Sequence, residues 1–126
     1  MVETKSTFRI FKTKRFARDA KRAQITDVDL CKAIKQVLKG QADDLGGGVY
    51  KKRLKENQYR SIILGKGKRF WVYIYLFAKK DQDNITDAEL GAFKKIAQIY
   101  ATKTESDIQK ELKTRELVEI CYAKEI

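Results

Sequence analysis

The chain of 126 residues is strongly basic, with 28 Lys and Arg residues against 17 Asp and Glu, and it has no histidine, no proline and two cysteines. The lack of histidine excludes Ser-His-Asp triads, ribonucleases with a histidine pair and histidine-ligated zinc. Two cysteines are too few for a four-thiolate metal site or a disulfide framework, and the length and the apolar fraction of 43% predict one globular domain.

The sequence lacks the apolar runs that secretion or membrane insertion requires. Residues 1–14 contain no run of seven apolar residues, and no stretch of 18 apolar residues occurs in the chain. We therefore expect a cytoplasmic protein that does not contact membranes. In that compartment, Cys31 and Cys121 are expected to be reduced and buried as small apolar side chains, with a disulfide between them as the alternative.

The first third of the chain predicts a strand followed by two helices. Apolar and polar residues alternate over residues 7–11, which is typical of a strand, and residues 12–22 follow with helical spacing and a basic composition. Thr26 and Asp29 form a capping box at the start of the second helix, which is expected to stop at Gly40. Its expected inner face consists of Val28, Leu30, Cys31, Ile34, Val37 and Leu38.

The middle of the chain predicts a turn and three strands. Residues 41–48 end in three glycines, and a phosphate-binding loop is the alternative to a plain turn, although neither a Lys-Ser/Thr pair nor a helix follows. The expected strands cover residues 49–54, 59–64 and 69–78. Because the two connections are short, we expect an antiparallel meander whose last and most apolar strand is central and covered on both faces.

The last part of the chain predicts two helices and an edge strand. Thr86 and Glu89 form a second capping box, a short polar helix covers residues 104–113, and residues 117–122 are typical of a strand. This order predicts a single α+β domain, with N-terminal helices packed on a three- to four-stranded, mainly antiparallel sheet and with C-terminal helices. The inner faces of the two C-terminal helices are expected to contain Leu90, Phe93, Ile96, Ala97 and Tyr100, and Ile108 and Leu112.

Positive charge is concentrated in the middle of the chain. Residues 46–80 contain ten Lys and Arg residues and one acid, Glu56. Because a solvated surface usually mixes both signs of charge, this block predicts a polyanionic partner, and nucleic acid is the first candidate. A lysine-rich solvated surface is the alternative. An anionic membrane is disfavoured, because no basic segment has a broad apolar helical face.

Several of these cations are expected to share one face of the sheet. Side chains two positions apart on a strand point the same way, so Lys51, Arg53 and Lys55 are expected to project together, with Arg60 beside them and Lys80 at the nearby rim. Such a cluster suits RNA cleavage, in which a 2′-OH attacks the neighbouring phosphate and cations stabilise the charge that develops. The same cluster equally suits passive phosphate binding.

Three of these segments, taken in order, resemble the core of RelE-type bacterial toxins. The segments are VYKKRL at residues 49–54, YRSIIL at residues 59–64 and YIYLFAKKD at residues 73–81. The likeness covers about residues 45–100, and it is strongest to the HigB-like, phage-associated members of the RelE/ParE superfamily. Residues 104–126 are interpreted as a C-terminal extension of the single RelE-like domain.

The resemblance implies a RelE-like fold and the toxin of a toxin–antitoxin module. Such a toxin is a ribosome-dependent endoribonuclease that cleaves mRNA with lysine and arginine, and it needs neither a metal nor another cofactor. The implied partners are the ribosome, mRNA and a cognate antitoxin, expected to be a small DNA-binding protein.

The resemblance also implies roles for individual residues. Lys51 and Arg53 match alternating basic residues that bind or activate at the scissile phosphate, with Lys51 or Lys55 as the better base. Arg60 matches an arginine that clamps the transition state, and Lys80 matches a basic residue after the third strand. Lys51, Arg53, Arg60 and Lys80 are therefore the expected catalytic residues, and the expected nucleic-acid-binding residues are Lys52, Lys55, Lys66, Lys68, Arg69 and Lys79.

Two other functions are compatible with these patterns. A ParE-like toxin keeps the fold but lacks the catalytic cations and inhibits DNA gyrase by binding, and a noncatalytic regulatory protein uses its basic sheet only to bind nucleic acid. The alternation of Lys51 and Arg53 together with Arg60 favours the endoribonuclease. The aromatic residues of the third strand are interpreted mainly as core, although Trp71, Tyr73 and Tyr75 can also stack on bases.

Overall fold

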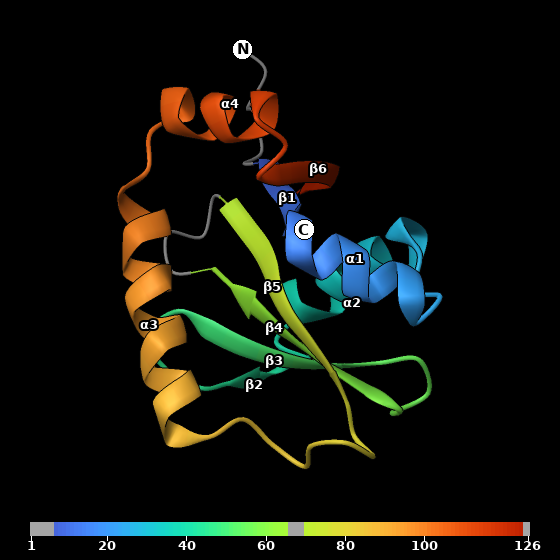
Figure 1. The fold of residues 1–126 in the computed structure, drawn as a ribbon. Helices are drawn as coiled ribbons and strands as arrows, with labels where there is room; N and C mark the ends of the chain where they lie inside the picture. Colours follow the sequence, from blue (N-terminus) through green and yellow to red (C-terminus); the bar gives the residue numbers. More distant parts are fainter. Residues whose placement is uncertain (1–6, 66–69, 125–126) are drawn as a thin grey trace.

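A computed structural model describes residues 7–65 and 70–124, and it shows a mixed β-sheet with helices on both faces (Figure 1). The predicted α+β fold is confirmed. None of the helices within these ranges is long and apolar enough to cross a membrane. The elements in chain order are β1 (Thr7–Thr13), α1 (Lys14–Arg22), α2 (Asp27–Leu38), β2 (Asp43–Asp44), β3 (Val49–Leu54), β4 (Tyr59–Leu64), β5 (Phe70–Ala78), α3 (Asp87–Thr102), α4 (Glu105–Lys113) and β6 (Leu117–Lys124).

The sheet is larger than the three or four strands that were predicted. Its strand order is β2-β3-β4-β5-β1-β6. The predicted antiparallel meander is present in β3, β4 and β5, and the short β2 extends it at one edge. On the other side, β1 pairs parallel to β5 and antiparallel to β6. The first and last predicted strands therefore join the same sheet, and β1 lies between strands that are distant from it in sequence.

Helices cover each face of the sheet with a separate apolar core. The first face, called the α1/α2 face, packs beneath α1 and α2, and the second, called the α3 face, packs beneath α3 and α4 (Figure 1). As predicted, β5 is covered on both faces, because Tyr73 belongs to the first core and Phe77 to the second. Other central residues are Phe16, Leu30, Ile34 and Ile63 on the α1/α2 face, and Val49, Ile62, Leu64 and Ala97 on the α3 face.

Polar side chains define the starts of the helices, as the sequence predicts. The Thr26 hydroxyl accepts from the Asp29 N–H at 3.2 Å, and the Asp29 carboxylate accepts from the Thr26 N–H at 2.9 Å. Thr86 and Glu89 form the same box at α3. The expected inner position of Val28 is wrong. Val28 lies two and a half helical turns before the buried Val37, so it is on the opposite side of α2, and it is 63% exposed. Of the expected inner face of α3, Ile96 is exposed as well.

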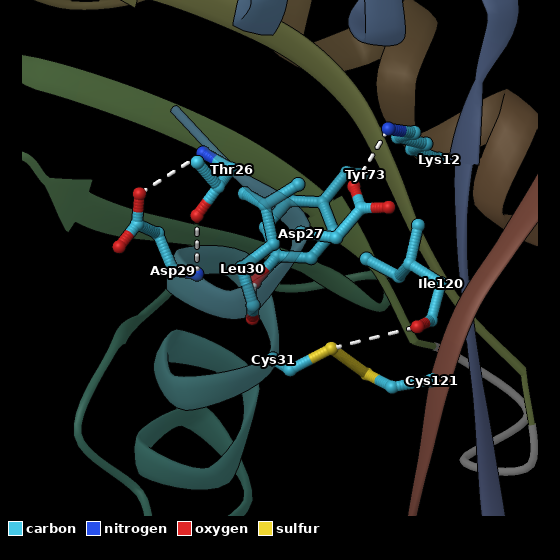
Figure 2. The surroundings of a disulfide bond; sticks show 9 residues. All are labelled: Lys12, Thr26, Asp27, Asp29, Leu30, Cys31, Tyr73, Ile120 and Cys121. Atoms are coloured by element: carbon cyan, nitrogen blue, oxygen red, sulfur yellow. Dashed lines mark hydrogen bonds and ion pairs between the residues drawn. A yellow bond between two sulfur atoms is a disulfide. The ribbon is translucent and has the colours of Figure 1, made fainter. Parts of the chain in front are cut away.

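The two cysteines form a disulfide, which corrects the expectation of reduced thiols (Figure 2). Cys31 of α2 and Cys121 of β6 have Cα atoms 6.3 Å apart and are separated by 90 residues in sequence. Their pairing depends on the packing of α2 beside β6, which no local pattern reveals. In the same region the Tyr73 hydroxyl donates to the Leu30 carbonyl at 2.7 Å, so that α2 is also joined to β5.

Candidate nucleic-acid interface and active site

Strands β3 and β4 bring three of the predicted catalytic residues to the α3 face. Along β3, Val49 packs in the core of the α3 face and Tyr50 packs on the α1/α2 face. Because side chains alternate along a strand, Lys51 and Arg53 lie on the α3 face with Val49. Arg53 is paired with Arg60 across β3 and β4, and paired residues present their side chains on the same face. The structure therefore places Lys51, Arg53 and Arg60 on one face of the sheet.

Arg60 is a buried cation whose charge is not balanced by a carboxylate. It is 6% exposed, and it is the one charged residue in the buried core of the described chain. Its Nη1 donates to the carbonyl oxygens of Asn57 at 2.9 Å and Tyr59 at 3.2 Å. Within residues 7–65 and 70–124, no Asp or Glu lies within ion-pair distance of Arg60. A buried charge is costly without an opposite charge, so this position favours an anionic ligand.

Lys51 is held by neighbours on two sides. Its Nζ donates to Oδ1 of Asn84 at 3.3 Å and lies 3.7 Å from Oδ2 of Asp43, and its side chain is 16% exposed. Asp43 belongs to β2, and Asn84 belongs to the connection between β5 and α3. By contrast, Arg53 is exposed, and no ion pair restrains it within the described residues. The cluster thus combines two restrained cations and one that is free to meet a ligand.

A hydrogen-bond network fixes the connection that contains Asn84. The Tyr75 hydroxyl donates to Oε1 of Gln82 at 3.1 Å, and Nε2 of Gln82 donates to the Asn84 carbonyl and to the Glu89 carboxylate, each at 2.9 Å. Burial, with a smaller contribution from the charge of Glu89, raises the pKa of Tyr75. The hydrogen bond from the Thr86 N–H is the main cause of the lowered pKa of Glu89. The network therefore joins a neutral phenol to an ionised carboxylate at the start of α3.

Tyr75 reaches this network because β5 contains a bulge. The register with β4 pairs Ile62 with Tyr75 and Ile63 with Tyr73, so that Ile74 is left without a partner on β4. As a result, Ile74 and Tyr75 both pack against the core of the α3 face, whereas Trp71 and Tyr73 belong to the core of the α1/α2 face. Trp71 and Tyr73 are buried, which confirms their interpretation as core residues.

The turn between β3 and β4 directs Lys55 away from the other cations. Lys55, Glu56 and Asn57 have φ values of 50°, 52° and 72°, so the strand alternation stops after Leu54. Nζ of Lys55 donates to the Ala23 carbonyl at 2.6 Å, on the α1/α2 face. The expectation that Lys55 projects with Lys51 and Arg53 is therefore wrong.

The remaining predicted nucleic-acid-binding residues have different positions. Lys52 faces the α1/α2 side, where its Nζ donates to the Gln41 carbonyl at 3.0 Å and burial lowers its pKa. Lys79 and the predicted catalytic residue Lys80 are both exposed just after β5. Both lysines line a cavity that Asn57 also lines. The Asn57 carbonyl accepts a hydrogen bond from Nη1 of Arg60. Lys66, Lys68 and Arg69 lie outside the described residues.

Sequence patterns did not identify two polar residues that position this surface. The two residues are Asn84 and Tyr75. Asn84 accepts a hydrogen bond from Lys51, and Tyr75 donates one to Gln82, whose amide donates to the Asn84 carbonyl. The one sequence feature that could have pointed to Asn84 was its place shortly before the capping box at Thr86. Tyr75 carried no such signal, because a regular strand that buries Tyr73 on one face would have pointed Tyr75 to the same face.

Comparison with known protein families covers almost the whole chain. The family model described as "RelE toxin of RelE / RelB toxin-antitoxin system" matches residues 8–120. The match begins in β1 and ends in β6, and it extends on both sides of residues 45–100, which carry the resemblance in the sequence. No curated protein and no solved structure matches the chain.

Proposed function

Because the chain belongs to the RelE family of toxins from toxin–antitoxin systems, we propose that it is a ribosome-dependent endoribonuclease that cleaves mRNA in the A site. Membership of this family also implies a cognate antitoxin. The observation that carries the proposal is the buried, uncompensated guanidinium of Arg60, which lies on the same face as Lys51 and Arg53. A scissile phosphate at this surface supplies the missing negative charge.

Arg60 and Arg53 are proposed to bind the phosphate. A guanidinium keeps its charge and donates two parallel hydrogen bonds to phosphate oxygens. Because Nη1 of Arg60 already donates to two carbonyl groups, the orientation of the guanidinium is fixed before the substrate arrives. Donors that are fixed in advance stabilise the charge that grows on the non-bridging oxygens in the transition state.

Lys51 and Lys80 are proposed to move the protons. Lys51, in its neutral form, accepts the proton of the 2′-OH as the 2′-oxygen forms a bond to phosphorus. The bond from phosphorus to the 5′-oxygen breaks, and the ammonium of Lys80 donates a proton to that leaving oxygen. The products are a 2′,3′-cyclic phosphate and a 5′-OH, so that atoms and charge balance without another reactant.

Mapping mRNA 5′ ends in cells tests this proposal. Induction of the wild-type protein is expected to arrest growth and to produce new 5′ ends at positions linked to codons, and Arg60→Ala is expected to abolish both. Because Arg60 is buried, Arg53→Ala serves as a second variant that removes an exposed cation without leaving a cavity. Lys110→Ala, an exposed cation of α4, is the matched control and should cleave like wild type.

The same experiment separates the alternatives. Growth arrest with intact mRNA would contradict the endoribonuclease and point to inhibition of another target such as DNA gyrase. The absence of arrest would favour a noncatalytic nucleic-acid-binding protein. Incubation of purified protein with mRNA, alone and on ribosomes, then checks the ribosome dependence, which predicts cleavage only on ribosomes.

A further inference from the structure

The disulfide between Cys31 and Cys121 joins the C-terminal part of β6 to α2 (Figure 2). Both residues are half-buried, so they lie near the surface rather than deep in the core. A thiolate must reach one of the two sulfur atoms to break such a bond, and disulfides near the surface are therefore reduced more easily than enclosed ones. The position of this crosslink favours its reversible formation.

A β-bulge divides β6 into two parts. Ile120 has no partner on β1, because the register between the two strands shifts at this residue. Residues 117–119 pair with β1 before the bulge, and residues 121–124, called the terminal segment of β6, pair with residues 7–10 after it. Because the bulge interrupts the ladder, the terminal segment can open from β1 while the first part stays paired.

The part of β6 before the bulge is anchored without the disulfide. Leu117 is buried in the core beneath α4. Nε and Nη2 of Arg9 each donate to the Glu119 carboxylate at 2.9 Å. The Glu116 carbonyl, just before the strand, accepts from the Lys14 N–H at 3.1 Å. Loss of the crosslink is therefore expected to leave this part of β6 in place.

The helix at the other end of the crosslink also keeps its place without the disulfide. The Tyr73 hydroxyl donates to the Leu30 carbonyl, and one side of α2 is buried in the core of the α1/α2 face. Sγ of Cys31 lies 3.8 Å from the Ile120 carbonyl oxygen, so a reduced Cys31 thiol has an acceptor for its weak S–H donor. The position of α2 is thus compatible with both oxidation states, and the disulfide acts mainly on the terminal segment of β6.

We propose that Cys31 and Cys121 form a redox latch, a crosslink that is made and broken by exchange with a low-molecular-weight thiol such as glutathione. In the oxidised protein, the latch holds the terminal segment of β6 against β1. In the reduced protein, this segment opens transiently while the rest of the sheet stays paired. Opening exposes backbone N–H and C=O groups of residues 7–10, a sheet edge that another strand or a protease can approach. This inference goes beyond RNA cleavage and does not depend on it.

Reduction of the latch proceeds by two thiol–disulfide exchanges. A glutathione thiolate attacks one sulfur, the bond between Cys31 and Cys121 breaks, and a mixed disulfide and one protein thiolate result. A second glutathione thiolate attacks the glutathione sulfur of the mixed disulfide and releases the other protein thiolate. The two protein thiolates take up the two protons that the glutathione thiols lost. Two glutathione molecules are thereby oxidised to one disulfide, and the protein gains two electrons.

Amide hydrogen exchange of the full chain, in a series of buffers from oxidised to reduced glutathione, tests the latch. Nuclear magnetic resonance follows single amides, and mass spectrometry after alkylation counts the free thiols in each buffer. We expect a change from the disulfide to two thiols across the series, with about tenfold faster exchange of the amides that bond residues 121–124 to residues 7–10. Amides between residues 117–119 and β1 should change much less. The control is the double variant Cys31→Ser and Cys121→Ser, which should exchange like the reduced wild type in every buffer.

Three results would overturn the latch. A disulfide that persists in reduced glutathione, or two thiols that persist in oxidised glutathione, would show that the bond is not reversible with this thiol. Equal exchange of residues 121–124 in the oxidised and reduced protein would show that the crosslink does not hold the terminal segment. A uniform increase of exchange over β1, β5 and β6 after reduction would show that the disulfide stabilises the whole domain rather than this segment.

Discussion

Lys51 and Asn84 are joined by a hydrogen bond of 3.3 Å that connects β3 to the segment before α3. We expect Asn84→Ala to lower the rate of RNA cleavage about tenfold, because Lys51 then loses one of the two neighbours that hold its amine. Single-turnover cleavage on ribosomes at increasing protein concentrations measures the effect, which should appear in the maximal cleavage rate more than in the protein concentration that gives half of that rate. Gln98→Ala, which removes an exposed amide of α3, is the control. A wild-type rate in Asn84→Ala would show that Lys51 needs no such positioning.

Arg60→Lys should retain the positive charge and still lose most of the activity. A lysine ammonium cannot keep both carbonyl contacts and also donate in the planar geometry of a guanidinium. We expect a loss of about 100-fold in cleavage rate, which is typical of the removal of a fixed donor to a transition state. Urea denaturation, followed by circular dichroism, checks that the variant is folded, and Arg53→Lys should lose less because Arg53 is exposed. Near-normal cleavage by folded Arg60→Lys would remove Arg60 from the mechanism.

The capping carboxylate of Glu89 predicts a loss of stability in acid. The hydrogen bond from the Thr86 N–H, with smaller contributions from Gln82 and Tyr75, lowers the pKa of Glu89 below its usual value near 4.5. The folded protein therefore binds this proton less readily than the unfolded chain, so the stabilisation is complete above that usual value and is lost as the pH falls through the lowered pKa.

Thermal unfolding of wild type and Glu89→Gln between pH 3 and 7 measures this dependence. The stability difference between the two proteins should be largest near neutral pH and should shrink as the solution is acidified. Glu116→Gln, at an exposed position outside the helices, is the control and should follow wild type. A difference that is constant with pH would contradict the role of the Glu89 charge.

The disulfide between Cys31 and Cys121 should contribute to stability without being needed for the fold. It closes a loop between residues 90 apart in sequence, and a crosslink of this kind commonly adds about 2–4 kcal/mol by restricting the unfolded chain. The Tyr73–Leu30 hydrogen bond and the ion pair of Lys12 with Asp27 at 2.7 Å also hold α2 in place. Reduction is therefore expected to lower the free energy of unfolding while the circular dichroism spectrum of the native state is retained.

Urea denaturation with and without a reductant checks the contribution of the disulfide. A Cys31→Ser variant should behave like the reduced wild type, and the reductant should have no further effect on it. Identical urea midpoints for oxidised and reduced wild type would mean that the crosslink adds nothing to stability.

Local sequence patterns were sufficient where a structural element depends on neighbouring residues. The bounds of β3 and β4 agree with the prediction, because alternation and short connections determine both strands. The capping boxes at Thr26 and Thr86 also formed as expected, since each involves residues only three positions apart. For the same reason, strand periodicity placed Lys51, Arg53 and Arg60 on one surface.

Contacts between distant segments and departures from regular backbone were not predictable in this way. The disulfide requires α2 and β6 to pack together, and the turn of left-handed residues moves Lys55 to the opposite face. The bulge at Ile74 brings Tyr75 toward Asn84, and one inserted residue is enough to change the face on which a strand residue lies. Each of these features depends on tertiary packing rather than on the periodicity of a segment.

The position of β1 has a consequence for the order in which the chain can fold. Among the strands of this sheet β1 is synthesised first, but its two partners, β5 and β6, begin only at Phe70 and Leu117. During synthesis, β1 has no strand to pair with until β5 is complete, and its second edge stays open until β6 follows. A nascent chain that stops before Leu117 therefore carries an unpaired strand edge, and the full sheet with its basic surface is a late product of translation.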